Sequence, residues 1–122
     1  MFDSSDETHA RLESARAAEV VRGRHHCDWI PEIKKMSDDE ALPLLLEIIS
    51  AAEESTKIAG WAMPRIYTHM AADIYARQGQ KDKAIEVCDR YLEHVEQFRM
   101  HKPEGGDRGV EEIIEVRDQL KS

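Results

Sequence analysis

Four polar side chains recur at steps of four residues near the middle of the sequence, so on a helix they would share one face. An arginine there offers a planar fork of donors for a carboxylate, and an aspartate accepts from backbone amides or basic side chains. In a stacked helical hairpin this face would line a shallow groove for a protein or peptide partner. A solvated face with intrahelical ion pairs explains the same spacing and is the default for a surface helix. The residues of this polar stripe are Arg65, His69, Asp73 and Arg77.

A second group with chemical potential is the tetrad His-His-Cys-Asp at residues 25–28, in which every side chain can bind a transition metal. Adjacent residues on a regular element point in different directions, however, and zinc ligands usually come in pairs two to four residues apart. Cys88 and His94 are six residues apart and share a helix face poorly. We therefore predict a polar loop that caps a helix, with no metal site and no cofactor.

Motifs of known enzymes are missing from the sequence. It contains no glycine-rich phosphate loop, no His-Glu-x-x-His and no Gly-x-Ser-x-Gly elbow. Acidic pairs at residues 38–39, 53–54 and 111–112 are expected on helix surfaces, where a charged, solvated face explains them. We predict no catalytic residues and no enzymatic activity.

The composition is that of a globular protein, with 41% hydrophobic and 34% charged residues among 122. No apolar run approaches the roughly 20 residues needed to cross a bilayer, and the N-terminus lacks a basic, apolar secretory signal. The two cysteines, Cys27 and Cys88, are too few for a disulfide framework, so we expect both to be reduced and Cys88 to lie in the core. These features predict a cytoplasmic protein with no membrane partner.

The formal net charge of −8 argues against nucleic-acid binding, which depends on neutralising phosphates. One local exception is the basic run at residues 22–26, with Lys34 and Lys35 nearby. Only Trp29 accompanies it as an aromatic platform, and an acidic body repels flanking phosphates. We therefore expect a protein or peptide partner and no nucleic acid.

Helical spacing of apolar residues runs through almost the whole chain, and strand signals are nearly absent, so we expect no sheet. Gly23 is expected to end a first helix with a thin apolar face, and Ser37 with Glu40 forms a capping box. Pro43 predicts a bend or a delayed start in the helix that follows. Further helices are expected from Pro64 to Gly79, over residues 82 to about 100, and over residues 107–122.

A weak internal repeat relates residues 39–42 to residues 82–85. In this region, residues 65–98 resemble a tetratricopeptide repeat, a unit of about 34 residues. Thr68 departs from the motif, standing where a large apolar residue is usual, and Glu96 stands where the closing proline is usual. The residues that carry the resemblance, at the small, aromatic, turn, small and packing positions, are Ala72, Tyr75, Gly79, Ala84 and Tyr91.

A second resemblance covers about residues 25–98. It is to a helical, repeat-like segment of assorted bacterial and phage proteins of uncertain function. The resemblance implies an α-hairpin interaction module and implies no reaction. Its matching residues are Asp28 to Lys34, Gly60-Trp61, Tyr67, Ala72, Ile74-Tyr75 and Arg90-Tyr91-Leu92.

We therefore predict an all-α protein of five or six helices packed as antiparallel, tetratricopeptide-repeat-like hairpins. Residues 1–122 form a single helical domain, with an edge helix at 1–23, hairpins at 25–100 and a C-terminal capping helix at 107–122. The expected function is a protein–protein interaction module, a scaffold or adaptor without catalysis. The alternative is a self-assembling structural or regulatory protein of a phage or bacterial system, whose first helix pairs with a second copy as a homodimer.

Overall fold

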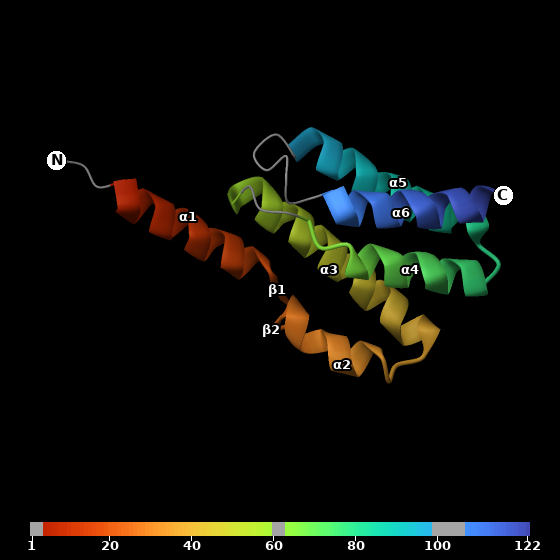
Figure 1. The fold of residues 1–122 in the computed structure, drawn as a ribbon. Helices are drawn as coiled ribbons and strands as arrows, with labels where there is room; N and C mark the ends of the chain where they lie inside the picture. The colour runs from red at the N-terminus through yellow and green to blue at the C-terminus, as the bar shows by residue number, and fades with distance from the viewer. Residues whose placement is uncertain (1–3, 60–62, 99–106) are drawn as a thin grey trace.

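The computed structural model describes residues 4–59, 63–98 and 107–122. Gly60 and Trp61, which carry part of the repeat resemblance, lie outside these ranges, as does the expected helix end near residue 100. Figure 1 shows the course of the chain. In order, the elements are α1 (Ser4–Ala18), β1 (Val20–Val21), β2 (Arg24–His25), the 3-10 helix η1 (His26–Trp29), α2 (Ile30–Ile33), α3 (Asp38–Ala59), α4 (Ile66–Arg77), α5 (Lys81–Phe98) and α6 (Asp107–Lys121).

The all-α fold class is confirmed, because six α-helices account for most of the described residues. The helix over residues 107–122 begins at Asp107 as expected. Helix α3 begins at Asp38, so Pro43 does not delay its start, and α4 begins at Ile66, two residues after Pro64. No helix in the described part of the chain is both long enough and apolar enough to cross a membrane.

The expectation of no sheet is wrong at one place, where β1 and β2 pair antiparallel. The first helix stops at Ala18, short of Gly23, because the β-branched pair Val20–Val21 favours extended backbone over helix. Gly23 serves the hairpin turn instead: φ is 84° at Gly23 and 51° at Arg22. Positive φ at both central residues is the geometry that a two-residue hairpin with right-handed twist requires.

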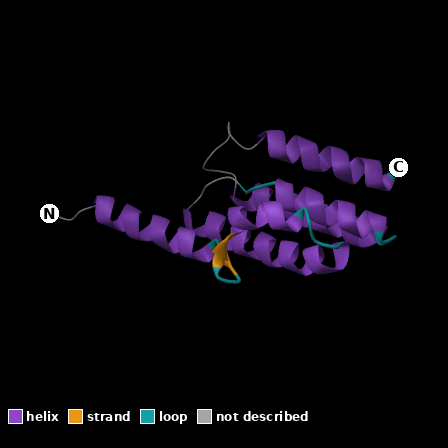
Figure 2. Cartoon of the chain, turned by 90° about the horizontal axis from the view of Figure 1, so that it is seen from below, coloured by secondary structure: helices purple, strands orange, loops and turns teal. Residues whose placement is uncertain are grey.

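Helices α3 to α6 form the body of the molecule, each packed on the next, with α6 also touching α4 (Figures 1 and 2). Helix α3 contributes the most apolar face and also supports α1 on its other side. Ala72 of α4 and Ala84 of α5 are buried, as the close approach of two hairpin helices requires. The most deeply buried apolar side chains of the body are Leu44, Leu45, Ile48, Ile49, Tyr67, Ala71, Ala84, Cys88 and Ile113.

Local signals set the helix ends of this body. The Ser37 hydroxyl accepts a hydrogen bond from the Glu40 amide at 3.3 Å and donates to the Glu40 carboxylate at 3.0 Å, so the predicted cap forms. At the end of α4, Gly79 has a φ of 75°. The Gln80 amide donates to the Tyr75 carbonyl at 2.8 Å and the Gly79 amide to the Ala76 carbonyl at 3.1 Å, a Schellman motif.

Candidate functional site

The predicted stripe lies along α4, and its first half is covered by a carboxylate from α6. Glu112 accepts a hydrogen bond from Arg65 Nε at 2.9 Å and one from His69 Nδ1 at 3.0 Å. These two donors, His69 first, hold the pKa of the Glu112 carboxyl below its usual range. The sequence predicts a solvated surface position for Glu112; nothing local marks it as a partner of the stripe, since Arg65 and His69 lie more than 40 residues earlier in the chain.

A glycine allows α6 to reach this position. Gly109 is buried, and a Cβ atom placed on it would lie 2.5 Å from the Tyr91 hydroxyl and 3.4 Å from Arg65 Cδ. Only a residue without a side chain fits there without displacing a neighbour. The first turns of α6 therefore pack closely against α4 and α5, which brings Glu112 beside Arg65 and His69.

The other end of the stripe is held by the start of α3. Arg77 donates from Nε to Asp38 Oδ2 at 3.0 Å and from a terminal nitrogen to Oδ1 at 2.9 Å. The hydrogen bond from Arg77 holds the pKa of Asp38 below its usual range. The fork that would bind a partner's carboxylate is thus bound to a carboxylate of the same chain, while both groups remain exposed at the surface.

Between these two pairs lies Asp73, the one carboxylate of the stripe, and it remains open to solvent. Its nearest ion-pair partner among the described residues is His69 Nε2, at 3.8 Å, beyond hydrogen-bond distance. The Asp73 side chain is 53% exposed. The structure therefore brings all four stripe residues to one face and leaves Asp73 as an acceptor for another molecule.

A groove runs beside this face. A hollow of about 560 Å³ lies between α4 and α6, and a smaller one of about 220 Å³ lies between α4 and the start of α3. Met70 and Asp73 line both, so the two hollows are neighbours along α4. We call the two hollows together the α4 groove; the larger one is lined by Pro64, Arg65, Ile66, His69, Met70, Asp73 and Glu112.

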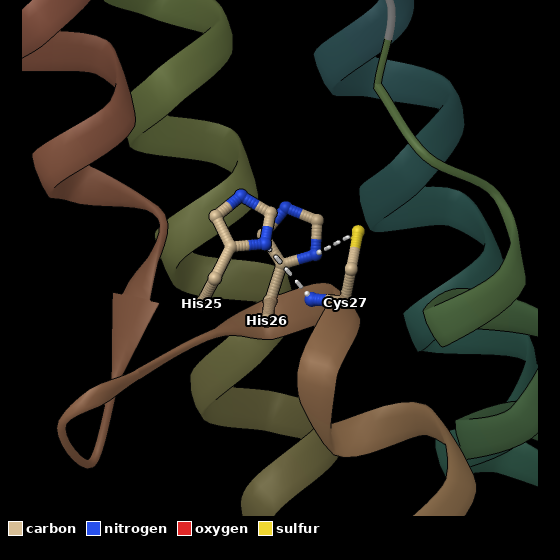
Figure 3. Close-up of side chains that lie close together, drawn as sticks. All are labelled: His25, His26 and Cys27. Carbon is tan, nitrogen blue, oxygen red and sulfur yellow. Dashed lines mark hydrogen bonds between the residues drawn. The ribbon is translucent and has the colours of Figure 1, made fainter.

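A second group of polar side chains meets at the start of η1, although their adjacency in the sequence predicts that they point apart. One ligand atom each from His25, His26 and Cys27 lies within 4.8 Å of the others. Figure 3 shows the three side chains rising from the same side of the chain. The premise that adjacent side chains point apart is wrong here, because the backbone passes from strand to 3-10 helix between His25 and His26.

Residues far away in the sequence surround this group. His25 Nε2 lies 2.7 Å from a Glu19 oxygen, and the other Glu19 oxygen accepts from the Ser55 hydroxyl at 2.6 Å. The ring of His26 is buried and is hydrogen-bonded through Nδ1 to the Tyr67 hydroxyl. Burial is the largest effect lowering the pKa of His26 and the largest raising that of Tyr67. The sequence marked neither Glu19 nor Tyr67 as a neighbour of this cluster.

Both cysteines are free, as expected. Cys88 is fully buried in the body, and burial raises the pKa of its thiol to about 11. Cys27 lies at the surface.

Comparisons with known protein families, with curated proteins and with solved structures give no match to this chain.

Proposed function

We propose that this protein is a non-catalytic protein-interaction module that binds a basic segment of a partner protein in the α4 groove. In the bound state an arginine or lysine of the partner pairs with Asp73. An apolar side chain next to it packs on Ile66 and Met70. The repeat-like resemblance supports this role and suggests a cytoplasmic protein of bacterial or phage origin.

The observation that carries the proposal is an exposed apolar side chain inside the α4 groove. Ile66 is 40% exposed, and in the described part of the chain only Val20 is another large hydrophobic residue so open to solvent. Ile66 and the half-buried Met70 line the same hollow as the open carboxylate of Asp73. An apolar patch rimmed by polar groups is typical of a protein-binding surface, since a partner removes the apolar area from water.

Charge selects the partner's chemistry. The cationic stripe residues Arg65 and Arg77 are paired with Glu112 and Asp38, whereas Asp73 has no hydrogen-bonded cation in the described residues. The whole chain carries a net charge of −8, which attracts a basic segment and repels an acidic one. A basic and apolar peptide segment therefore fits better than a free carboxylate.

Peptide display tests this proposal. A random peptide library is selected on the wild-type protein and counter-selected on the double variant Ile66→Ser/Asp73→Arg. We expect enriched peptides that carry Arg or Lys beside a large apolar residue, and we expect their affinity to fall at least tenfold on Asp73→Arg. Glu93→Arg, an equal charge change at an exposed position on α5 outside the groove, serves as the matched control.

The melting temperatures of these variants should stay close to that of the wild type, because exposed substitutions usually change stability by less than about 0.5 kcal/mol. Selection of acidic peptides, or equal binding by wild type and Asp73→Arg, would contradict the proposal. So would an equal loss of affinity in Glu93→Arg, which would indicate long-range charge alone.

Self-assembly is the second candidate, and the position of α1 favours it. Both ribbon views show this helix extending beyond the body formed by α3 to α6 (Figures 1 and 2). Residues 7–11 of α1 are all exposed. Light scattering across a range of concentrations separates the two candidates: a dimer that dissociates on removal of residues 1–11 supports self-assembly, and a monomer throughout excludes it.

A further inference from the structure

The backbone at the start of η1 brings three metal-binding side chains together. His25 is extended, with φ −60° and ψ 141°, and caps η1 by accepting the Cys27 amide on Nδ1 at 3.1 Å. His26 and Cys27 then begin the 3-10 helix, so the three side chains rise on one side (Figure 3). Their ligand atoms lie within 4.8 Å, about 1 Å wider than in a tetrahedral site with bonds of roughly 2.0–2.3 Å.

A carboxylate orients the first imidazole. Glu19 lies 2.7 Å from Nε2 of His25 and is itself fixed by the Ser55 hydroxyl at 2.6 Å. With Nε2 facing a carboxylate, Nδ1 is the nitrogen of His25 left for a metal, which would take the place of the Cys27 amide that Nδ1 now accepts. Metal-binding histidines are held by the same arrangement, in which an outer carboxylate fixes the ring and raises its basicity.

The second imidazole already points at the thiol. His26 Nδ1 lies 3.6 Å from Cys27 Sγ, and the Tyr67 hydroxyl lies 4.0 Å from the same sulfur. A metal that took the Nδ1 lone pair would release the Tyr67 hydroxyl from His26. That hydroxyl, 4.0 Å from the sulfur, would need only a small movement to donate to the thiolate, so the Tyr67 hydroxyl would keep an acceptor.

The charges around the cluster suit a dication. Binding converts the Cys27 thiol to a thiolate and releases its proton. The thiolate and the Glu19 carboxylate then balance the two positive charges of the metal. The neighbouring cations do not oppose it, since Arg22 is paired with Glu47 and Arg24 with Glu32.

We infer that His25, His26 and Cys27 form a zinc site, with Glu19 as the carboxylate that positions His25. Two imidazole nitrogens and a thiolate are a borderline-soft ligand set, which selects zinc over magnesium or calcium. Three protein ligands leave the fourth position to water, and Cys27 is exposed enough for the ion to enter. Because Tyr67 and Ser55 belong to α4 and α3, bound zinc would fix the N-terminal hairpin to the body.

Cobalt titration of the full chain tests the inference, because Co²⁺ takes the same tetrahedral ligands and gives a visible spectrum. We expect one equivalent of Co²⁺ to produce thiolate-to-cobalt charge transfer and tetrahedral bands, and Zn²⁺ to displace it. Cys27→Ser should abolish the charge-transfer band and weaken zinc binding at least tenfold. Glu19→Gln should keep the band but weaken binding by about 10–100-fold.

Controls distinguish the site from adventitious binding. His9→Ala removes an exposed α1 histidine outside the cluster, and Cys88→Ala removes the buried thiol; both should keep the spectrum and the affinity. Zinc should also raise the melting temperature of the wild type and leave that of Cys27→Ser unchanged. Absence of a cobalt spectrum at one equivalent, or an unchanged spectrum in Cys27→Ser, would overturn the inference.

Discussion

The helical body from α3 to α6 and the N-terminal segment from α1 to α2 are stabilised in different ways. In the body, apolar side chains from four helices are buried against one another. In the described N-terminal segment, the buried apolar residues are Ala15, Val21 and Ile33. Trp29 and Ile30 pack partly buried against the core, and polar contacts add to this, such as the hydrogen bond from Trp29 Nε1 to the Val21 carbonyl at 2.9 Å.

This difference affects where binding sites can form. A packed apolar interior tolerates little change in volume, so its residues are occupied with holding the fold. A segment held by polar contacts keeps imidazole, thiol and carboxylate groups near the surface, as at His25 and Cys27. The α4 groove lies on the outside of the body and combines the two, with exposed Ile66 beside charged groups from α6 and α3.

The largest effect is expected from overpacking the body. Ala84→Leu places three extra carbon atoms where Ala84 has no exposed surface, which should cost about 1–3 kcal/mol in the free energy of unfolding. Urea unfolding followed by circular dichroism measures it. Ala76→Leu, at an exposed position of α4, is the control and should change stability little. Equal effects would show that α4 and α5 are not closely packed.

A slightly smaller effect is expected where α6 packs closely against Tyr91 of α5. Gly109→Ala places a methyl group against the Tyr91 hydroxyl, at a cost of about 1–3 kcal/mol. The better helix propensity of alanine returns roughly 0.5–1 kcal/mol of this. Tyr91→Phe removes the clashing oxygen, so the double variant should be more stable than Gly109→Ala alone. A double-mutant cycle with no coupling between the two positions would refute the close approach.

A single substitution in the N-terminal segment should lower the free energy of unfolding by less. Trp29→Phe keeps an aromatic ring but removes the indole N–H that donates to Val21. We expect a loss of about 0.5–1.5 kcal/mol, the usual contribution of one hydrogen bond. The substitution should accelerate amide hydrogen exchange more in the β1–β2 hairpin than in α4. Uniform acceleration in both would indicate that the segment and the body unfold as one unit.

The smallest effect expected is a pH dependence from a buried histidine of the body. The ring of His94 is hydrogen-bonded to Thr56 at 2.6 Å, and burial is the largest effect on its pKa, which is lowered. Glu53 opposes this shift, while Lys57 and Arg90 add to it. In the unfolded chain His94 has the ordinary histidine pKa of about 6.5. Below that pH the unfolded chain therefore binds more protons at His94 than the folded chain does. The free energy of unfolding should therefore fall as the pH drops below about 6.5.

Urea titrations above and below this pH measure the dependence. His94→Gln keeps an N–H donor for Thr56 and cannot be protonated, so its free energy of unfolding should fall less over the same interval. An identical fall in both proteins would show that other groups cause the pH dependence.

The sequence alone was sufficient for the positions of most helices. Apolar spacing, the Ser37 cap and Gly79 act over a few residues, so the chain encodes them locally. It also placed the four stripe residues on one helix face. The end of the first helix was predicted wrongly at Gly23, because the β-branched residues Val20 and Val21 favour extended backbone and end the helix at Ala18.

The tertiary structure decided which groups meet. Glu112 reaches Arg65 and His69 because Gly109 lets α6 approach, and Arg77 finds Asp38 across the helix interface. Each of these partners lies more than 35 residues away along the chain, and many carboxylates on the sequence would satisfy an arginine equally well. Local periodicity fixes the face on which a side chain lies, but the packing of whole helices selects its partner.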